Sequence, residues 1–226
     1  MLKGTPTRTV SQRAYEALKH AILLGDIPAG TRLVETYYAK RLNISRTPLR
    51  EAIRLLELDD LVAFAPTRGA VVTGFTLSDI EETFTIRNAL MMLLLPGIVQ
   101  NCGDRHLAQL RGYLAQMDLS QAAEDSEKLS VQNRAFHKTL EHISDRKRIL
   151  RVVDSQEELI IRFSASAIAL IVHHSKAQEE HHQMVELLER KDEAALAALM
   201  RHHLDESKES CLAAFRQKAA QKENLP

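Results

Sequence analysis

The sequence predicts a mainly α-helical protein with two domains: a small N-terminal domain of helices followed by a β-hairpin, and a larger all-α bundle. Apolar residues recur at spacings of three and four along most of the 226-residue chain, as they do in amphipathic helices. β-branched or apolar runs separated by a turn occur in one short segment, residues 61–73. Hydrophobic residues make up 45% of the chain, which is enough for a substantial core.

Charge and composition divide the chain near residue 75. Residues 1–75 hold 11 Lys and Arg against 7 Asp and Glu, whereas the remainder holds 19 against 23, so the neutral total hides two oppositely charged parts. Nine of the ten histidines lie after residue 100. We therefore expect two domains, residues 1–74 and 75–226, with different binding partners.

The first domain is predicted to begin with three short helices. We expect the first helix over residues 11–24 with Ser11 as its N-cap, and the second over residues 35–42. Ser45 is expected to cap the third helix through its hydroxyl, and Pro48 fits the first turn because it removes no intrahelical bond there. The third helix is expected to bury one face, made of Leu49, Ala52, Ile53, Leu56 and Leu58.

The residues after the third helix predict a β-hairpin. The runs LVAFA and AVVT flank the segment PTRG, whose proline and glycine suit a tight turn. A helix, a turn, a capped helix with arginines near its N-terminus and an arginine-tipped hairpin together predict a winged helix-turn-helix. In that fold the third helix enters the DNA major groove with its N-terminal residues at the base edges.

The arginines on the outward face of the third helix and on the hairpin are suited to binding DNA. Arg46 and Arg50 can read guanine, because the guanidinium fork matches the O6 and N7 acceptors of that base, and Arg68 tips the wing. Arginines are also common on a solvated helix face, which is the simpler interpretation of Arg54. Further contacts to the DNA backbone are expected from Ser45, Thr47 and Gly69.

The segment LVETYYAKRLNISRTPLREAIRLLELDDLVAFAPTRGAVV resembles the DNA-binding domain of the GntR family of bacterial transcription regulators. The shared features are a leucine–glutamate pair, the run Ser-Arg-Thr-Pro-Leu-Arg-Glu-Ala at residues 45–52, and an Arg-Gly wing. Tyr38 and Asp60 depart from the family pattern, away from the expected contact surface. The resemblance implies DNA contacts from Arg32, Arg46, Thr47, Arg50, Thr67, Arg68 and Gly69.

Residues 75–226 predict an all-α antiparallel helical bundle. Facing helices of such a bundle bury their apolar stripes together and can enclose a ligand cavity. Helical segments are expected to begin near Ser78, Asp104, Ser120, Asp145, Ser175 and Asp192.

Four polar residues of the bundle have the spacing or register of metal ligands. Asn133 and His137 are four residues apart, so they project from one face of a helix. His181 and His203 are each in register with the apolar positions of their own segments. A single inward histidine is usually a satisfied core residue, and this alternative stays open for each of the three. Three inward histidines with an amide favour a metal site.

Residues 76–226 resemble the FCD ligand-binding domain of FadR-type GntR regulators, and EEHHQMVELLERKDEAALAALMRHHL fits its closing pattern. Many members hold a divalent metal there with one aspartate and three histidines. The resemblance therefore implies zinc, nickel or manganese here, although the amide of Asn133 lacks the charge of the usual aspartate. The matching positions are Asn133, His137, His181 and His203.

The same resemblance implies a small-molecule effector. FadR-type members commonly respond to organic acids or related metabolites, so we expect an effector of this kind, with a carboxylate favoured. Arg87 matches the family pattern and is the expected effector contact, whereas Met91 stands where a glutamate is common.

Two features bear on localisation. The N-terminus lacks an apolar signal core, and the longest apolar run, residues 89–99, is shorter than the roughly 18 residues of a membrane span. Cys102 and Cys211 form no disulfide framework and are expected to be buried small hydrophobes, which favours a reducing compartment. We expect a cytoplasmic protein with no membrane partner.

These features and the two resemblances predict a ligand-responsive transcription regulator of a metabolic operon, with a repressor favoured over an activator. It is expected to bind an inverted-repeat operator in double-stranded DNA as a homodimer. The alternative is a metal-dependent enzyme with an accessory DNA-binding domain, because three histidines with an open position can activate water. The sequence contains no HExxH motif, nucleophile elbow or phosphate-cradling glycine loop, so we expect no enzyme.

Overall fold

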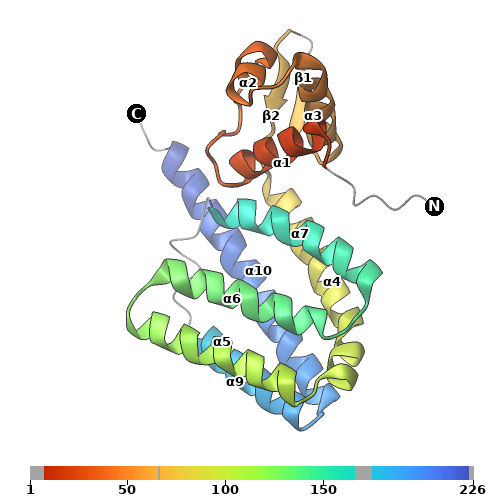
Figure 1. The fold of residues 1–226 in the computed structure, drawn as a ribbon. Helices are drawn as coiled ribbons and strands as arrows, with labels where there is room; N and C mark the ends of the chain where they lie inside the picture. The colour runs from red at the N-terminus through yellow and green to blue at the C-terminus, as the bar shows by residue number, and fades with distance from the viewer. Residues whose placement is uncertain (1–7, 66, 166–174, 224–226) are drawn as a thin grey trace, which may run out of the picture. The chain divides into compact units, whose positions relative to one another are not determined.

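The computed structural model describes residues 8–65, 67–165 and 175–223. It is mainly α-helical with a two-stranded sheet, as predicted. The chain divides into two compact units, Met1–Thr76 and Leu77–Pro226, two residues beyond the expected boundary. Figure 1 shows the order of the elements within each unit.

The N-terminal unit is a winged helix-turn-helix, as predicted. The two strands pair antiparallel, with Val62 opposite Val72 and Ala65 opposite Gly69. Gly69 begins the second strand with φ +69°, a left-handed conformation that glycine adopts without steric cost. The elements are α1 (Val10–Leu23), α2 (Glu35–Arg41), α3 (Arg46–Leu58), β1 (Val62–Ala65) and β2 (Gly69–Val72).

Packing of α1 against α3 forms the core of this unit. Residues at helical spacing on each helix face the other, so the opposite face of α3 stays in solvent. The buried residues are Ala14, Leu18 and Ile22 of α1, and Leu49, Ala52, Ile53 and Leu56 of α3. The exposed face of α3 carries Arg46, Arg50 and Arg54, as predicted.

Three details of these helices were predicted wrongly. The N-cap of α1 is Thr9 rather than Ser11, because Thr9 and Gln12 each accept a hydrogen bond from the backbone of the other, at 3.2 and 3.0 Å. Ser45 holds the N-cap position of α3, but its hydroxyl makes no capping bond within the described residues. Leu58 is 79% exposed, because two residues after Leu56 the helix has turned to its opposite face.

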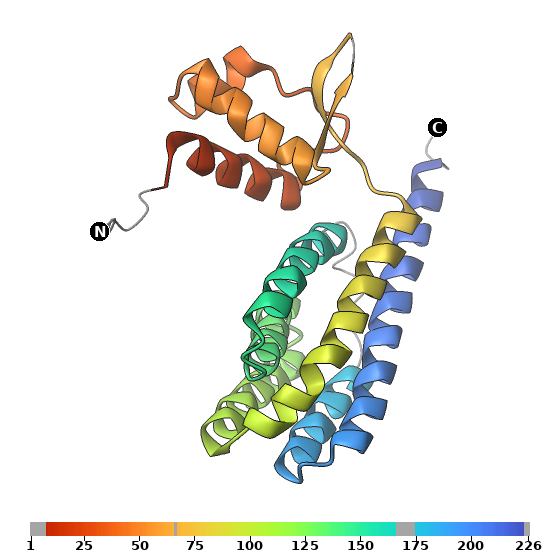
Figure 2. The ribbon, with the colours of Figure 1, turned by 90° about the vertical axis from the view of Figure 1, so that its right-hand side faces the viewer.

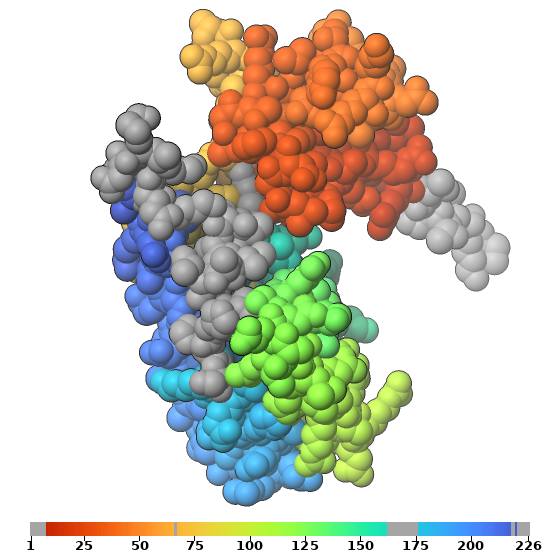
Figure 3. Space-filling model, turned by 90° about the vertical axis from the view of Figure 1, so that its left-hand side faces the viewer, coloured from red at the N-terminus to blue at the C-terminus, as the bar shows by residue number. Residues whose placement is uncertain are grey.

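The C-terminal unit is the predicted all-α bundle. The long helices α4 and α10 run side by side in opposite directions, as Figures 1 and 2 show. α5 packs against both α6 and α9, and this face of the bundle is seen in Figure 3. The helices are α4 (Leu77–Asn101), α5 (Asp104–Ala122), α6 (Ser126–His142), α7 (Lys147–Ala165), α9 (Ser175–Glu189) and α10 (Glu193–Glu223).

Five of the six expected helix starts lie within two residues of an observed start, and one is wrong. Ser120 does not begin a helix but lies buried inside α5. The next helix, α6, begins at Ser126 and is capped by Asp125, whose side chain accepts a hydrogen bond from the Lys128 amide at 3.0 Å. Asp192 caps α10 as expected, by accepting from the Ala195 amide at 3.0 Å.

Burial explains two apolar features of the bundle. Of the described helices, α4 is the one long and apolar enough to cross a membrane by length and composition, and 44% of its most apolar window is buried. Its residues Leu94 and Ile98 are fully enclosed in the bundle core. Cys102 and Cys211 are buried free thiols, and burial raises the pKa of Cys211 to about 11.

Candidate functional site

The first candidate site is the exposed N-terminal end of α3. The side chains of Arg46 and Arg50 are 56% and 57% exposed, and both bind the carboxylate of Glu35 at the start of α2. Nη2 of Arg46 donates to Oε2 at 2.8 Å, and Nε of Arg50 donates to Oε1 at 2.8 Å. Nothing in the sequence singled out Glu35 as their partner, because it lies 11 and 15 residues away.

All residues predicted to bind DNA are exposed. Arg32 forms an isolated backbone bridge with Val71, which places it beside β2 of the wing. Thr67 and Arg68 lie in the turn that joins the two strands. The exposed set is Arg32, Ser45, Arg46, Thr47, Arg50, Thr67, Arg68 and Gly69.

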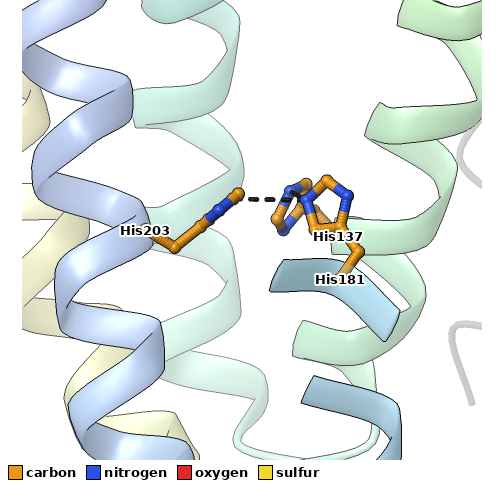
Figure 4. A group of neighbouring side chains, drawn as sticks. All are labelled: His137, His181 and His203. Carbon is orange, nitrogen blue, oxygen red and sulfur yellow. Dashed lines mark hydrogen bonds between the residues drawn. The ribbon is translucent and has the colours of Figure 1, made fainter. Parts of the chain in front are cut away.

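The second candidate site is a cluster of three histidines inside the bundle. His137 of α6, His181 of α9 and His203 of α10 point toward one another, as Figure 4 shows. Nε2 of His181 lies 3.1 Å from Nε2 of His137 and 3.3 Å from Nε2 of His203. The nitrogens that could act as ligands all lie within 4.8 Å of one another, which is compact enough to hold one metal ion.

Neighbouring side chains determine which ring nitrogens carry protons. Nδ1 of His203 lies 2.8 Å from a carboxylate oxygen of Glu180, so it must donate a proton to that oxygen. The amide nitrogen of Gln178 donates to Asp118 at 2.6 Å, which turns the amide oxygen toward Nδ1 of His181 at 3.4 Å. In both rings Nδ1 is therefore the donor, and the lone pair lies on Nε2.

This arrangement brings two lone pairs together. Nε2 of His181 and Nε2 of His203 are 3.3 Å apart, and with Nδ1 protonated neither neutral ring has a hydrogen to place between them. A cation among the Nε2 atoms would remove this repulsion. Imidazole nitrogen is a common ligand of zinc and nickel, so the donor set fits a divalent ion.

Burial keeps the rings neutral, which metal ligation requires. Burial, reinforced by the neighbouring histidines and Arg87, holds the pKa of His137 well below its ordinary value. Burial, with a contribution from His203, lowers the pKa of His181 to about 3. The pKa of His203 is lowered by burial as well, although Glu180 opposes the shift.

Asn133 borders the same cavity, which has a volume of about 260 Å³ and is lined by all three histidines. Among the described residues, neither the Asn133 oxygen nor Nδ1 of His137 has a hydrogen-bond partner, although both atoms are buried. An orphaned buried amide oxygen is costly unless something binds it. Asn133 therefore offers an oxygen on the cavity wall beside the three nitrogens.

The structure places Arg87, the predicted effector contact, on the cavity wall, but its guanidinium is already paired. Its Nη2 donates to Oε1 of Glu141 at 2.8 Å, with the two side chains only 12% and 1% exposed. Burial raises the pKa of Glu141 to about 7, and Arg87 opposes this shift. Sequence reasoning missed Glu141, although its position four residues after His137 puts it on the same face of α6.

Comparisons with known proteins cover both units. The model of the gntR family of bacterial regulatory proteins matches residues 10–72, and the FCD domain model matches residues 82–206. An uncharacterized HTH-type transcriptional regulator of Bacillus subtilis, YdhC, is 30% identical over 148 residues, 65% of this chain and 66% of that one. The gluconate operon transcriptional repressor of Bacillus subtilis is 32% identical over 127 residues, 56% and 51% of the two chains.

These matches span between half and two thirds of the two relatives' own length. Among solved structures, a GntR transcriptional regulator from Rhodococcus sp. RHA1 has a TM-score of 0.70 at 25% identity, covering 90% of this chain and 98% of that one. The families and relatives are transcription regulators rather than enzymes, which removes the enzyme alternative. The chain belongs to the GntR family of bacterial regulatory proteins, as a transcription regulator in which an FCD domain follows the DNA-binding domain.

Proposed function

We propose that this regulator is a cytoplasmic homodimer that represses a metabolic operon and releases its operator when a small carboxylate binds the bundle. The observation that carries the proposal is the pairing of two sites in one chain. One unit presents Arg46 and Arg50 on an exposed helix end, and the other holds a cavity of about 260 Å³ lined by His137, His181 and His203. Repressors among the relatives support the sign of regulation.

The direct test is an effector screen on the full-length protein. Fluorescence anisotropy of a labelled operator duplex, selected by this protein from random DNA, would report release when a carboxylate binds. We expect at least one small carboxylate to weaken operator binding and to be recovered chemically unchanged. Uncharged analogues of the same size serve as controls. Operator release by the uncharged analogues alone would contradict the carboxylate proposal.

We also propose that the operator is a short inverted repeat bound by the dimer. A single winged domain makes few phosphate contacts, so useful specificity requires two of them on one duplex. Footprinting is therefore expected to show two protected half-sites related by a two-fold axis, about one helical turn or a multiple of it apart. Protection of a single unrepeated half-site by a monomer would contradict this prediction.

Within the FCD domain we propose a divalent metal held by His137, His181 and His203, with Asn133 as an oxygen ligand. The support is the opposed lone pairs at 3.3 Å and the orphaned oxygen of Asn133. Nitrogen ligands favour zinc or nickel over manganese. Once bound, the ion would supply positive charge for an effector carboxylate. Arg87 contributes less to such recognition while Glu141 holds its guanidinium.

Replacing Asn133 with aspartate is expected to raise the metal content of the purified protein. The wild-type protein should carry zinc or nickel at less than one ion per chain, because Asn133 supplies no charge. Asn133→Asp adds a carboxylate at the cavity wall, where negative charge stabilises a divalent ion. Elemental analysis measures the occupancy, and Asn133→Ala, which removes the oxygen, is the matched control. Equal occupancy in all three proteins would exclude this residue as a ligand.

A further inference from the structure

One carboxylate connects the two arginines expected to read DNA. Glu35 accepts from Nε and Nη2 of Arg46, at 3.1 and 2.8 Å, both on Oε2. It also accepts from Nε of Arg50, at 2.8 Å on Oε1 and 2.9 Å on Oε2. Because Glu35 opens α2 while both arginines lie in the first two turns of α3, the carboxylate bridges the two helices of the helix-turn-helix.

The bridge leaves the base-reading end of an arginine available. Bidentate recognition of guanine uses two N–H donors of the guanidinium fork. Toward Glu35, Arg50 uses only Nε, so the terminal Nη1 and Nη2 groups are not engaged by this carboxylate. Arg46 donates from Nε and from one N–H of Nη2, so Nη1 and the second N–H of Nη2 are not engaged by this carboxylate.

The bridge also reduces the positive charge that the helix end presents to phosphates. Hydrogen bonds from Arg50 and then Arg46 lower the pKa of Glu35, which keeps it ionised. Two guanidinium groups and one carboxylate carry a net charge of +1 instead of +2. Attraction to phosphates does not depend on the DNA sequence. The orientation of the guanidinium fork, in contrast, strengthens binding only where a matching base lies opposite it.

We propose that Glu35 is a positioning residue that determines the sequence specificity of DNA binding: it holds Arg46 and Arg50 in their reading geometry and offsets part of their attraction to phosphates. The inference rests on the proposed base-reading role of the two arginines. It assigns discrimination between operator and non-operator DNA to a residue that contacts neither base nor phosphate directly.

The test compares operator DNA with a scrambled duplex of equal composition, using full-length Glu35→Gln protein and anisotropy over a series of salt concentrations. The uncharged amide removes the ion pairs and frees one positive charge. Affinity for the scrambled duplex is expected to rise about fivefold near 0.15 M salt, with a salt slope steeper by about one, because each added phosphate contact contributes about 0.9 to that slope. Affinity for the operator is expected not to rise. The specificity ratio, which is operator affinity divided by affinity for the scrambled duplex, should therefore fall by about fivefold or more.

Two further variants separate charge from geometry. Glu51→Gln, at an exposed position on α3, changes the net charge equally but leaves the bridge intact, so it should preserve the specificity ratio. Glu35→Asp keeps the charge but shortens the side chain, so the scrambled duplex should bind as it binds the wild type while the ratio still falls. The proposal is overturned if Glu35→Gln, like Glu51→Gln, changes the affinities for the operator and for the scrambled duplex by the same factor.

Failure of the base-reading role on which the inference rests is distinguishable from failure of the inference itself. If Arg46→Ala and Arg50→Ala keep the full preference for the operator, the two arginines do not read bases, and both the base-reading role and the role of Glu35 fail. If those variants lose the preference while Glu35→Gln retains it, base reading stands and the role of Glu35 is wrong. Thermal melting of each variant checks that the exposed substitutions leave the fold intact.

Discussion

Replacing Arg46 or Arg50 with alanine is expected to weaken operator binding by about 1–3 kcal/mol, roughly 5- to 150-fold, and to relax the preference for one base pair in each half-site. Both side chains are more than half exposed at the N-terminal end of α3, the part of a helix-turn-helix that meets base edges. Binding of each variant to a panel of singly substituted operators would locate the base pair that each arginine reads.

The matched control is Arg54→Ala. Arg54 lies on the same exposed face of α3 but two turns from its N-terminus, where a helix in the groove moves away from the bases. It should change affinity much less and leave the base preference unchanged. A loss of equal size on every sequence would instead identify Arg46 and Arg50 as phosphate contacts. Dimerisation should be normal in all three variants.

Local chemistry made the N-terminal unit predictable. The turn segment and the flanking β-branched residues predicted the wing, and the apolar spacing predicted the buried face of α3, because both depend on residues close in sequence. Ser120 shows the limit of this reasoning. It is a good capping residue, but its hydroxyl donates to Gln132 on α6 at 2.9 Å, so a partner from another helix satisfies it inside α5.

The histidine cluster was predicted from helical register, but its surroundings were not. Register shows which side of a helix a residue faces. It correctly predicted that the side chains of His181 and His203 are buried in the bundle. The protonation of these rings depends on contacts with Glu180 and Gln178. The charge of Arg87 is offset by Glu141, which lies 54 positions away in the sequence. Two of these residues could have been found from helical register, because Glu180 is next to His181 and Glu141 follows His137 by four residues, and both are buried.

Replacing His181 with alanine is expected to abolish both metal binding and the effector response, while operator binding without effector stays at the wild-type level. His181 is central in the cluster, since its Nε2 lies 3.1 and 3.3 Å from the other two Nε2 atoms. Without it His137 and His203 remain as two nitrogen ligands, fewer than a stable zinc site uses. The DNA-binding unit, Met1–Thr76, is a separate compact unit and keeps its own core.

Elemental analysis measures the metal, and anisotropy with and without effector measures the response. His182→Ala is the matched control, because His182 is the next residue on α9 but lies outside the cluster and binds Asp118 at 3.2 Å. Removing the metal from wild-type protein with a chelator should reproduce the His181→Ala result, which separates loss of the ion from damage to the bundle. Melting curves of the metal-free proteins test such damage directly.

Normal release of operator by a variant with alanine at His137, His181 and His203 would contradict the metal proposal. The histidines would then be core residues, and the cavity would have to recognise a carboxylate through the remaining charged groups on its wall. Arg87 is the candidate, but a carboxylate could bind its guanidinium only by displacing Glu141 or sharing the guanidinium with it. Glu141→Gln would then strengthen the effector response, whereas with the metal as the main anchor it should change that response little.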